Sequence, residues 1–163
     1  MEFTQKEVER FESDKILSEK LQSEKELKEL DSLNKELDKI HAIYRQNNLF
    51  LLHWSWSYPN ENSKFVDVDI TVINPYKQKI KYVWFTFIAF NPVGDPIRNG
   101  INGKTEKIAK GIGPIKYGDK GSYNFESVFY SKVIDNIRVK QIKIQFFDGT
   151  FKIIVSPREV NKE

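Results

Sequence analysis

Three residue types that support most catalytic and metal chemistry are scarce in this chain. Its 163 residues include no cysteine, two histidines and one methionine. The absence of cysteine excludes a disulfide framework, a thiol nucleophile and a thiolate metal site. His41 and His53 lack the HExxH spacing of a zinc site and have no nucleophile-elbow motif nearby. We therefore expect a non-enzymatic protein that needs no cofactor or metal.

Long apolar segments are also missing. No apolar run approaches the roughly 18 to 20 residues that a membrane span needs, and no signal-peptide pattern opens the chain. Met1–Phe3 is either a native start or a remnant of cloning ahead of a truncated export segment. We expect a bacterial protein of the cell envelope or a secreted one if Met1 is not the native start, and a cytoplasmic one otherwise.

Glycine and proline are absent from residues 4–46, whereas residues 49–155 contain all eight glycines and five of the six prolines. The first segment is rich in Glu, Lys and Leu, and the second in aromatic residues and apolar–polar alternation. This change of composition predicts a charged helix over 1–48, a β-sandwich over 49–156 and a C-terminal tail over 157–163.

The predicted helix has an apolar stripe with coiled-coil spacing. The intervals between its residues follow the 3-4-3-4 alternation of a coiled-coil seam. The core of the stripe consists of Leu30, Leu33, Leu37, Ile40 and Tyr44. The stripe either packs on the chain's own sandwich or associates with another helix; a third alternative is a solvated spacer. We expect the partner to be a protein or a second copy of the chain.

Charge is distributed unevenly between the two parts. Residues 1–48 contain 9 Lys or Arg and 12 Asp or Glu, and the remainder contains 17 and 11. An acidic helix and a basic domain attract each other, within one chain or between chains. The basic excess spread over a lysine-rich sandwich is typical of a solvated surface, so we expect no nucleic-acid binding.

Short alternating segments separated by turn signals fill the second part. Residues 80–90 form the longest predicted strand, which is apolar on both faces from Val83 onward. It should be central and covered on both sides, and the cover of its second face is left for the helix or a partner to supply. Asp148-Gly149 predicts a two-residue type I′ hairpin turn. Gly111–Pro114 and Tyr117–Asp119 bracket a predicted corner. The other predicted strands cover 49–58, 64–74, 105–110, 140–146 and 151–155, with one starting at 122–125. About seven such strands suggest an immunoglobulin-like (Ig-like) sandwich.

Three segments resemble the bacterial Ig-like modules of the FxLyD and telokin-like type. They are VWFTFIAFNPVGDP from Val83, GIGPIKYGDKGSYNF from Gly111 and VKQIKIQFFDGTFKIIV from Val139. The resemblance covers residues 49–155 and departs at Tyr117, where these modules usually have proline. It implies an antiparallel Ig-like sandwich that acts as a non-catalytic module.

The remaining motifs are weak. Gly103-Lys104-Thr105 resembles the end of a phosphate-binding loop, but Arg98 stands where that loop needs glycine. Among the aromatic residues, Phe129 and Tyr130 lie in a predicted loop and are the best candidates for an exposed contact. The main functional hypothesis is a structural or protein-interaction module; the alternative is a module that binds a carbohydrate or peptide through these loop aromatics.

Overall fold

The computed structural model describes residues 2–100 and 102–160. The chain divides into two compact units, Met1–Ile40 and His41–Glu163. Helix α1 (Gln5–Gln46) supplies the first unit and the start of the second. The second unit therefore begins eight residues before the first strand.

Helix α1 begins at a capping-box sequence, Thr4-x-x-Glu7. The backbone N–H of Thr4 donates to the Glu7 carboxylate at 2.9 Å, and the Glu7 N–H donates to the Thr4 carbonyl at 3.0 Å. The bonds from Thr4 hold the pKa of Glu7 below its usual range. The predicted long helix is confirmed: residues 5–46 form one α-helix, and they contain no glycine or proline that would interrupt it.

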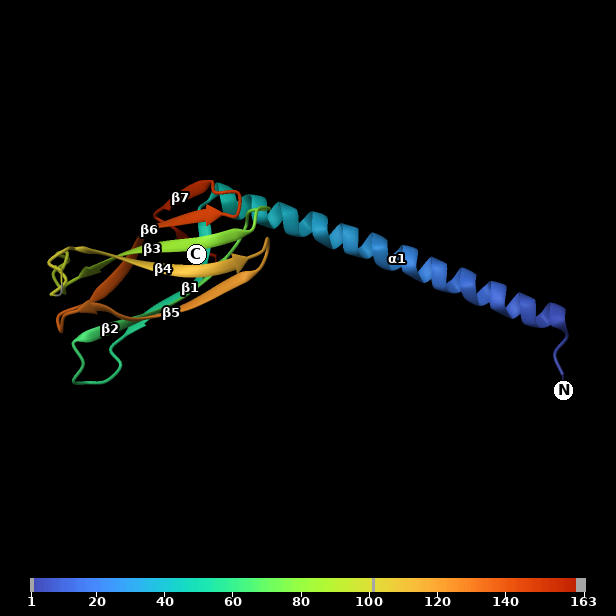
Figure 1. Ribbon diagram of the computed structural model, residues 1–163, viewed down its shortest axis with the longest axis horizontal. Helices are drawn as coiled ribbons and strands as arrows, with labels where there is room; N and C mark the ends of the chain where they lie inside the picture. Colours follow the sequence, from blue (N-terminus) through green and yellow to red (C-terminus); the bar gives the residue numbers. More distant parts are fainter. Residues whose placement is uncertain (1, 101, 161–163) are drawn as a thin grey trace. The chain divides into compact units, whose positions relative to one another are not determined.

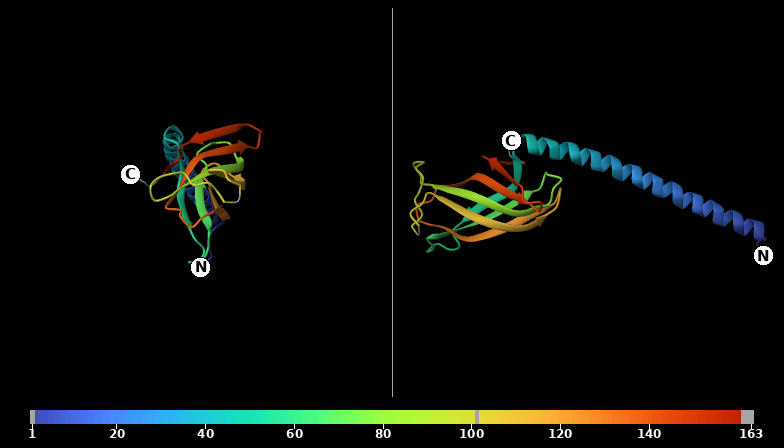
Figure 2. Two further views of the ribbon diagram at one scale, coloured as in Figure 1. Left: turned by 90° about the vertical axis from the view of Figure 1, so that its left-hand side faces the viewer. Right: turned by 45° about the horizontal axis from the view of Figure 1, so that its top comes forward.

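The second unit contains two four-stranded sheets, which form the layers of a sandwich (Figures 1 and 2). Sheet 1 has the strand order β5-β2-β1-β8, and sheet 2 has the order β4-β3-β6-β7. All pairs are antiparallel except β1 with β8. The strands are β1 (Leu49–Ser57), β2 (Phe65–Ile73), β3 (Ile80–Phe90), β4 (Glu106–Ile115), β5 (Lys120–Tyr130), β6 (Asn136–Phe146), β7 (Phe151–Val155) and β8 (Arg158–Glu159).

Alternation along β2 and β3 builds the centre of the core. Val66, Val68, Ile70 and Val72 of β2 are buried, as the pattern predicts. On β3 the residues from Val83 to Ala89 that face inward are fully buried, and Phe85 stacks on Phe87 with centroids 6.2 Å apart. The central position of β3 is confirmed. Its second face is only half covered, so the predicted cover of that face by the helix or a partner stays a prediction.

Two predicted features near sheet edges are wrong. The predicted strand over 105–110 is too short, because β4 continues through Gly111–Pro114 to Ile115 and the chain turns only after it, before β5. The residues after β7 are not only a tail, because Arg158–Glu159 pair with β1 as the parallel strand β8. In β1 the pairing shifts between Leu51 and His53, so two consecutive residues, Phe50 and Leu51, are buried.

Candidate functional site

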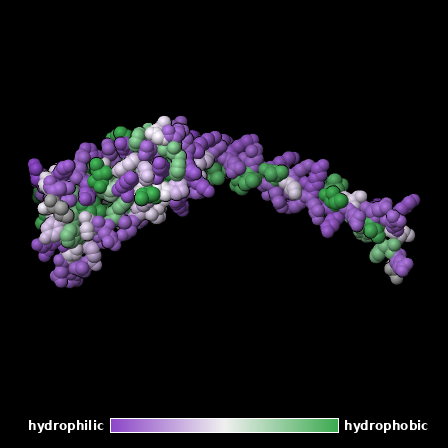
Figure 3. Space-filling view, viewed as in Figure 1, coloured by the Kyte–Doolittle hydropathy of each residue, from purple (hydrophilic) through white to green (hydrophobic). Residues whose placement is uncertain are grey.

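The predicted apolar stripe lies exposed on the first unit. Leu30, Leu33, Leu37 and Ile40 have exposed fractions between 42 and 58%. Apolar side chains recur along the helix between hydrophilic ones (Figure 3). We call these four residues together with Leu27 the leucine stripe. Its exposure leaves a ridge of large aliphatic groups available for contact.

Carboxylates border the leucine stripe. At about 100° per residue, Glu29 and Glu36 fall on one side of the stripe, and Asp31 and Asp38 on the other. The lysines of the same turns point to the opposite side of the helix. Asp31 forms an exposed pair with Lys35 at 3.1 Å, which adds little stability. The stripe is therefore an apolar surface with acidic edges.

Tyr44, the last residue of the predicted stripe, belongs to the second unit. Its ring stacks on His41 with centroids 5.8 Å apart, and His41 is buried against the edge of Tyr117 at 4.7 Å. Arg45 donates to the Pro75 carbonyl. Burial raises the pKa of Tyr76 next to this bond, and the Arg45 charge opposes the rise. The end of α1 is thus a structural anchor of the β unit.

The predicted loop at Phe129 and Tyr130 is wrong, because both residues end strand β5. Phe129 is fully buried in the core, so it cannot form a surface contact. Tyr130 is half-buried and packs on Phe65 with centroids 4.8 Å apart, beneath the Lys64 ammonium at 5.7 Å. This corner does not provide the open aromatic site that was expected.

The outward side of sheet 2 is instead rich in exposed apolar side chains at both edges. Edge strand β4 contributes Ile108 and Ile112, and edge strand β7 contributes Phe151, Ile153 and Val155. Their exposed fractions lie between 52 and 70%. Singly exposed apolar residues are common, but aligned ridges on both edges of one sheet are typical of an interaction surface.

Aromatic and basic side chains fill the space between these two ridges. Register places Trp84 of β3 between Lys110 of β4 and Lys143 of β6. The Lys110 ammonium lies 3.9 Å from the Tyr82 ring centroid and 5.5 Å from that of Trp84. The Lys143 ammonium lies 4.5 Å from the Phe151 centroid. We call the two ridges, with Tyr82, Trp84, Lys110 and Lys143, the apolar–basic face.

A sequence signal for this face exists in the alternation of single strands. Phe151, Ile153 and Val155 alternate with lysine and Ile154, and Ile108 and Ile112 alternate on β4. Alternation shows that odd- and even-numbered residues of a strand lie on opposite faces of the sheet, but it does not show which face is buried. Only the pairing of β7 with β6 assigns Ile154 to the core and the other three to the outward side. The sequence therefore indicated an uncovered second face on the central strand but could not assign these edge residues to it.

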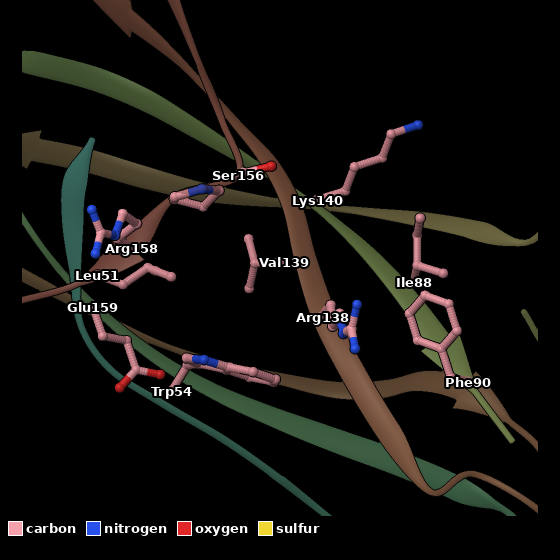
Figure 4. Close-up of a pocket in the computed structure, with 11 residues that line it drawn as sticks. Leu51, Trp54, Ile88, Phe90, Arg138, Val139, Lys140, Ser156, Arg158 and Glu159 are labelled. Atoms are coloured by element: carbon pink, nitrogen blue, oxygen red, sulfur yellow. The ribbon is translucent and has the colours of Figure 1, made fainter. Parts of the chain in front are cut away.

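A pocket of about 510 Å³ opens beside β6, where β7 has ended (Figure 4). Trp54, Leu51 and Val139 give it apolar walls. Its charged lining consists of Arg138, Lys140 and Arg158 with one carboxylate, Glu159, and is therefore net positive. The Arg138 guanidinium also lies 5.1 Å from the Phe90 ring centroid. Such a mixture suits a small anionic ligand that has an apolar body.

Among residues 2–100 and 102–160, no group of three or more His, Asp or Glu side chains is arranged to hold a metal ion. In the same part of the chain, no helix combines the length and apolar character that a membrane crossing needs. No protein-family model matches the chain, and no curated protein matches it significantly.

Proposed function

We propose that this chain is a non-catalytic protein-interaction module, in which an Ig-like sandwich carries a helix that mediates association. The leucine stripe is the observation that carries the proposal. Four large aliphatic residues at coiled-coil spacing remain about half exposed. Each such side chain is worth roughly 1.5 to 3 kcal/mol when it is fully buried, so the stripe can supply much of the free energy of an association.

The strand order supports the Ig-like part of the proposal. An Ig sandwich has its first, second and fifth strands in one sheet, and its third, sixth and seventh in the other. Here β1, β2 and β5 share sheet 1, whereas β3, β6 and β7 share sheet 2, with β4 next to β3. Ig-like sandwiches serve many unrelated functions, so the exposed surfaces, and not the fold, indicate the function.

The test is the double variant Leu33→Asp with Leu37→Asp, which puts two charges on the leucine stripe. We expect the full chain to change from an oligomer to a monomer in light scattering, with its β signal unchanged. Ser18→Asp with Ser32→Asp adds the same charge to α1 outside the stripe and should leave the oligomer intact. A less stable β unit in the stripe variant would mean that the stripe packs within its own chain.

The pocket beside β6 favours ligand binding as the second candidate function. Its lining combines Trp54 with two arginines, in place of the loop aromatics that were expected to bind a ligand. If the stripe variant changes neither oligomeric state nor melting, the helix is a solvated spacer. The functional assignment then moves to a small anionic ligand in this pocket.

A further inference from the structure

We propose that the apolar–basic face of sheet 2 is the docking site for the leucine stripe of a second copy of this chain. This inference rests on the proposed function and names the surface to which the stripe binds. The two surfaces match in their dimensions, their polarity and their charge.

The two surfaces agree in size. From Leu27 to Ile40 the stripe extends about 20 Å along the helix, at 1.5 Å per residue. From Tyr82 to Ile88 strand β3 extends about 20 Å, at roughly 3.3 Å per residue. Three strand spacings separate β4 from β7, which is about 14 Å, and a helix with its side chains is about 10 to 12 Å wide. One helix therefore fits lengthwise between the two edge ridges.

The distribution of apolar groups also agrees. A helix in this position has Ile108 and Ile112 on one side and Phe151, Ile153 and Val155 on the other, with Trp84 below its axis. Its leucines would then contact Trp84 and Tyr82, which are half-buried and still have surface to lose. Docking removes exposed apolar area from both partners, which is the main driving force of most protein association.

Charge favours this pairing over one between two helices. The carboxylates of Glu29, Glu36, Asp31 and Asp38 border both sides of the stripe. Two such helices would offer each other acidic borders and no basic ones, whereas Lys110 and Lys143 stand on either side of Trp84. The lysines therefore face the acidic borders of a docked helix, and complementary charge of this kind selects partners.

The experiment compares two full-length variants by sedimentation velocity over a range of concentrations. The face variant is Ile108→Glu with Ile153→Glu; both side chains are more than half exposed, so folding should be retained. The stripe variant is Leu33→Asp with Leu37→Asp. The control is Val93→Glu, at a turn position that is 80% exposed and outside sheet 2.

We expect wild type and the control to associate. Each variant alone should have a dissociation constant at least about 100-fold higher, because its substitutions remove contacts at the centre of the interface. Mixing the two variants should restore a 1:1 complex. The face variant still has an intact stripe, and the stripe variant still has an intact face. A symmetric helix–helix contact cannot be restored in this way, because one of the two stripes is always damaged.

Three results would overturn the inference. If the face variant associates like wild type while the stripe variant is monomeric, the helix mediates association but binds another surface, and the proposed function stands. If wild type is monomeric at every concentration, both proposals fail. If both variants are monomeric and no 1:1 complex forms on mixing, the stripe and the face are not partners.

Discussion

Individual residues decide where the strands of this sandwich turn and which side chains they bury. At the β6–β7 turn, Gly149 has φ +86°, as predicted, but Asp148 is not in the left-handed region. The Gly149 N–H donates to the Phe146 carbonyl at 3.0 Å. The Phe146 N–H donates to the Thr150 carbonyl at 2.9 Å. The predicted type I′ turn is therefore wrong, and a three-residue loop with glycine at its left-handed position takes its place.

The left-handed φ makes Gly149 sensitive to substitution. We expect Gly149→Val to lower the free energy of unfolding by about 1 kcal/mol or more, because a β-branched residue is strained at positive φ. Space is not the cause, since an added Cβ would meet nothing within 4 Å. Gly149→Asn is the control and should cost less, because asparagine tolerates this conformation. Equal thermal melts for wild type and Gly149→Val would contradict the assignment.

Residue-level geometry also explains why Phe129 could not be assigned from sequence. Pairing between β2 and β5 shifts between Val66 and Val68, where Ser127 has φ +55° and its N–H donates to the Asp67 carboxylate at 2.9 Å. The shift buries two consecutive residues, Val128 and Phe129. A strict alternation along β5 cannot predict that, because the bulge depends on the partner strand.

At the scale of elements, strong alternation and apolar content located the strands correctly. Glycine was a poor indicator of where a strand ends. The predicted limits of β3 are confirmed, because its long apolar run is bounded by turn residues. Gly111 and Gly113 were assigned to one side of a corner, so the predicted strand ended at Lys110, five residues before β4 does. They instead permit close approach, since an added Cβ would lie 2.6 Å from the Tyr123 ring at Gly111 and 2.4 Å from the Ile80 carbonyl oxygen at Gly113.

A buried asparagine connects the turns at one end of the two sheets. Asn74 is fully buried, and its side-chain amide donates to the carbonyls of Gln78 and Ile115, both at 2.9 Å. Its side-chain oxygen accepts from the Tyr76 N–H at 2.9 Å, and its backbone bonds to Gly118 and Asp119. The residue thus holds the β2–β3 turn against the β4–β5 turn.

We expect Asn74→Asp to destabilise the β unit by about 3 kcal/mol or more in urea unfolding. The substitution removes both amide donors and buries a negative charge beside two carbonyl oxygens. The same chemical change at the exposed Asn62 is the control and should stay within about 0.5 kcal/mol of wild type. If Asn74→Asp unfolds at the same urea concentration as wild type, the hydrogen bonds of the Asn74 side chain contribute little to the stability of the β unit.

At the scale of the whole molecule, the sequence predicted a helix and a β-sandwich because their periods and compositions differ. It could not place the boundary between compact units. Residues 41–46 continue the helical pattern, yet His41 is buried against Tyr117, which is 76 residues later in the chain. Contacts this distant in sequence are not visible in local periodicity. The full extent of the apolar–basic face could not be predicted for the same reason. Its residues come from four strands, and only the pairing of those strands brings them together.

Two truncations test where the β unit begins. A chain that starts at His41 should melt within about 2 °C of the β-sheet transition of the full chain, because the compact unit stays whole. A chain that starts at Leu49 loses the buried His41, its stacking on Tyr44 and the Arg45 bond to Pro75. Together these contacts are worth about 1 to 3 kcal/mol, so we expect a melting temperature lower by about 5 °C or more.

The melting temperatures of the two truncated chains are measured by circular dichroism, at a concentration low enough for each chain to be a monomer. The single substitution His41→Ala in the longer chain should reproduce part of the loss. His53→Ala is the matched control, because His53 is exposed on β1 and its removal should leave the melt unchanged. If both truncated chains melt together, the last turns of α1 do not stabilise the sandwich. The β unit then begins at its first strand, as the sequence alone predicted.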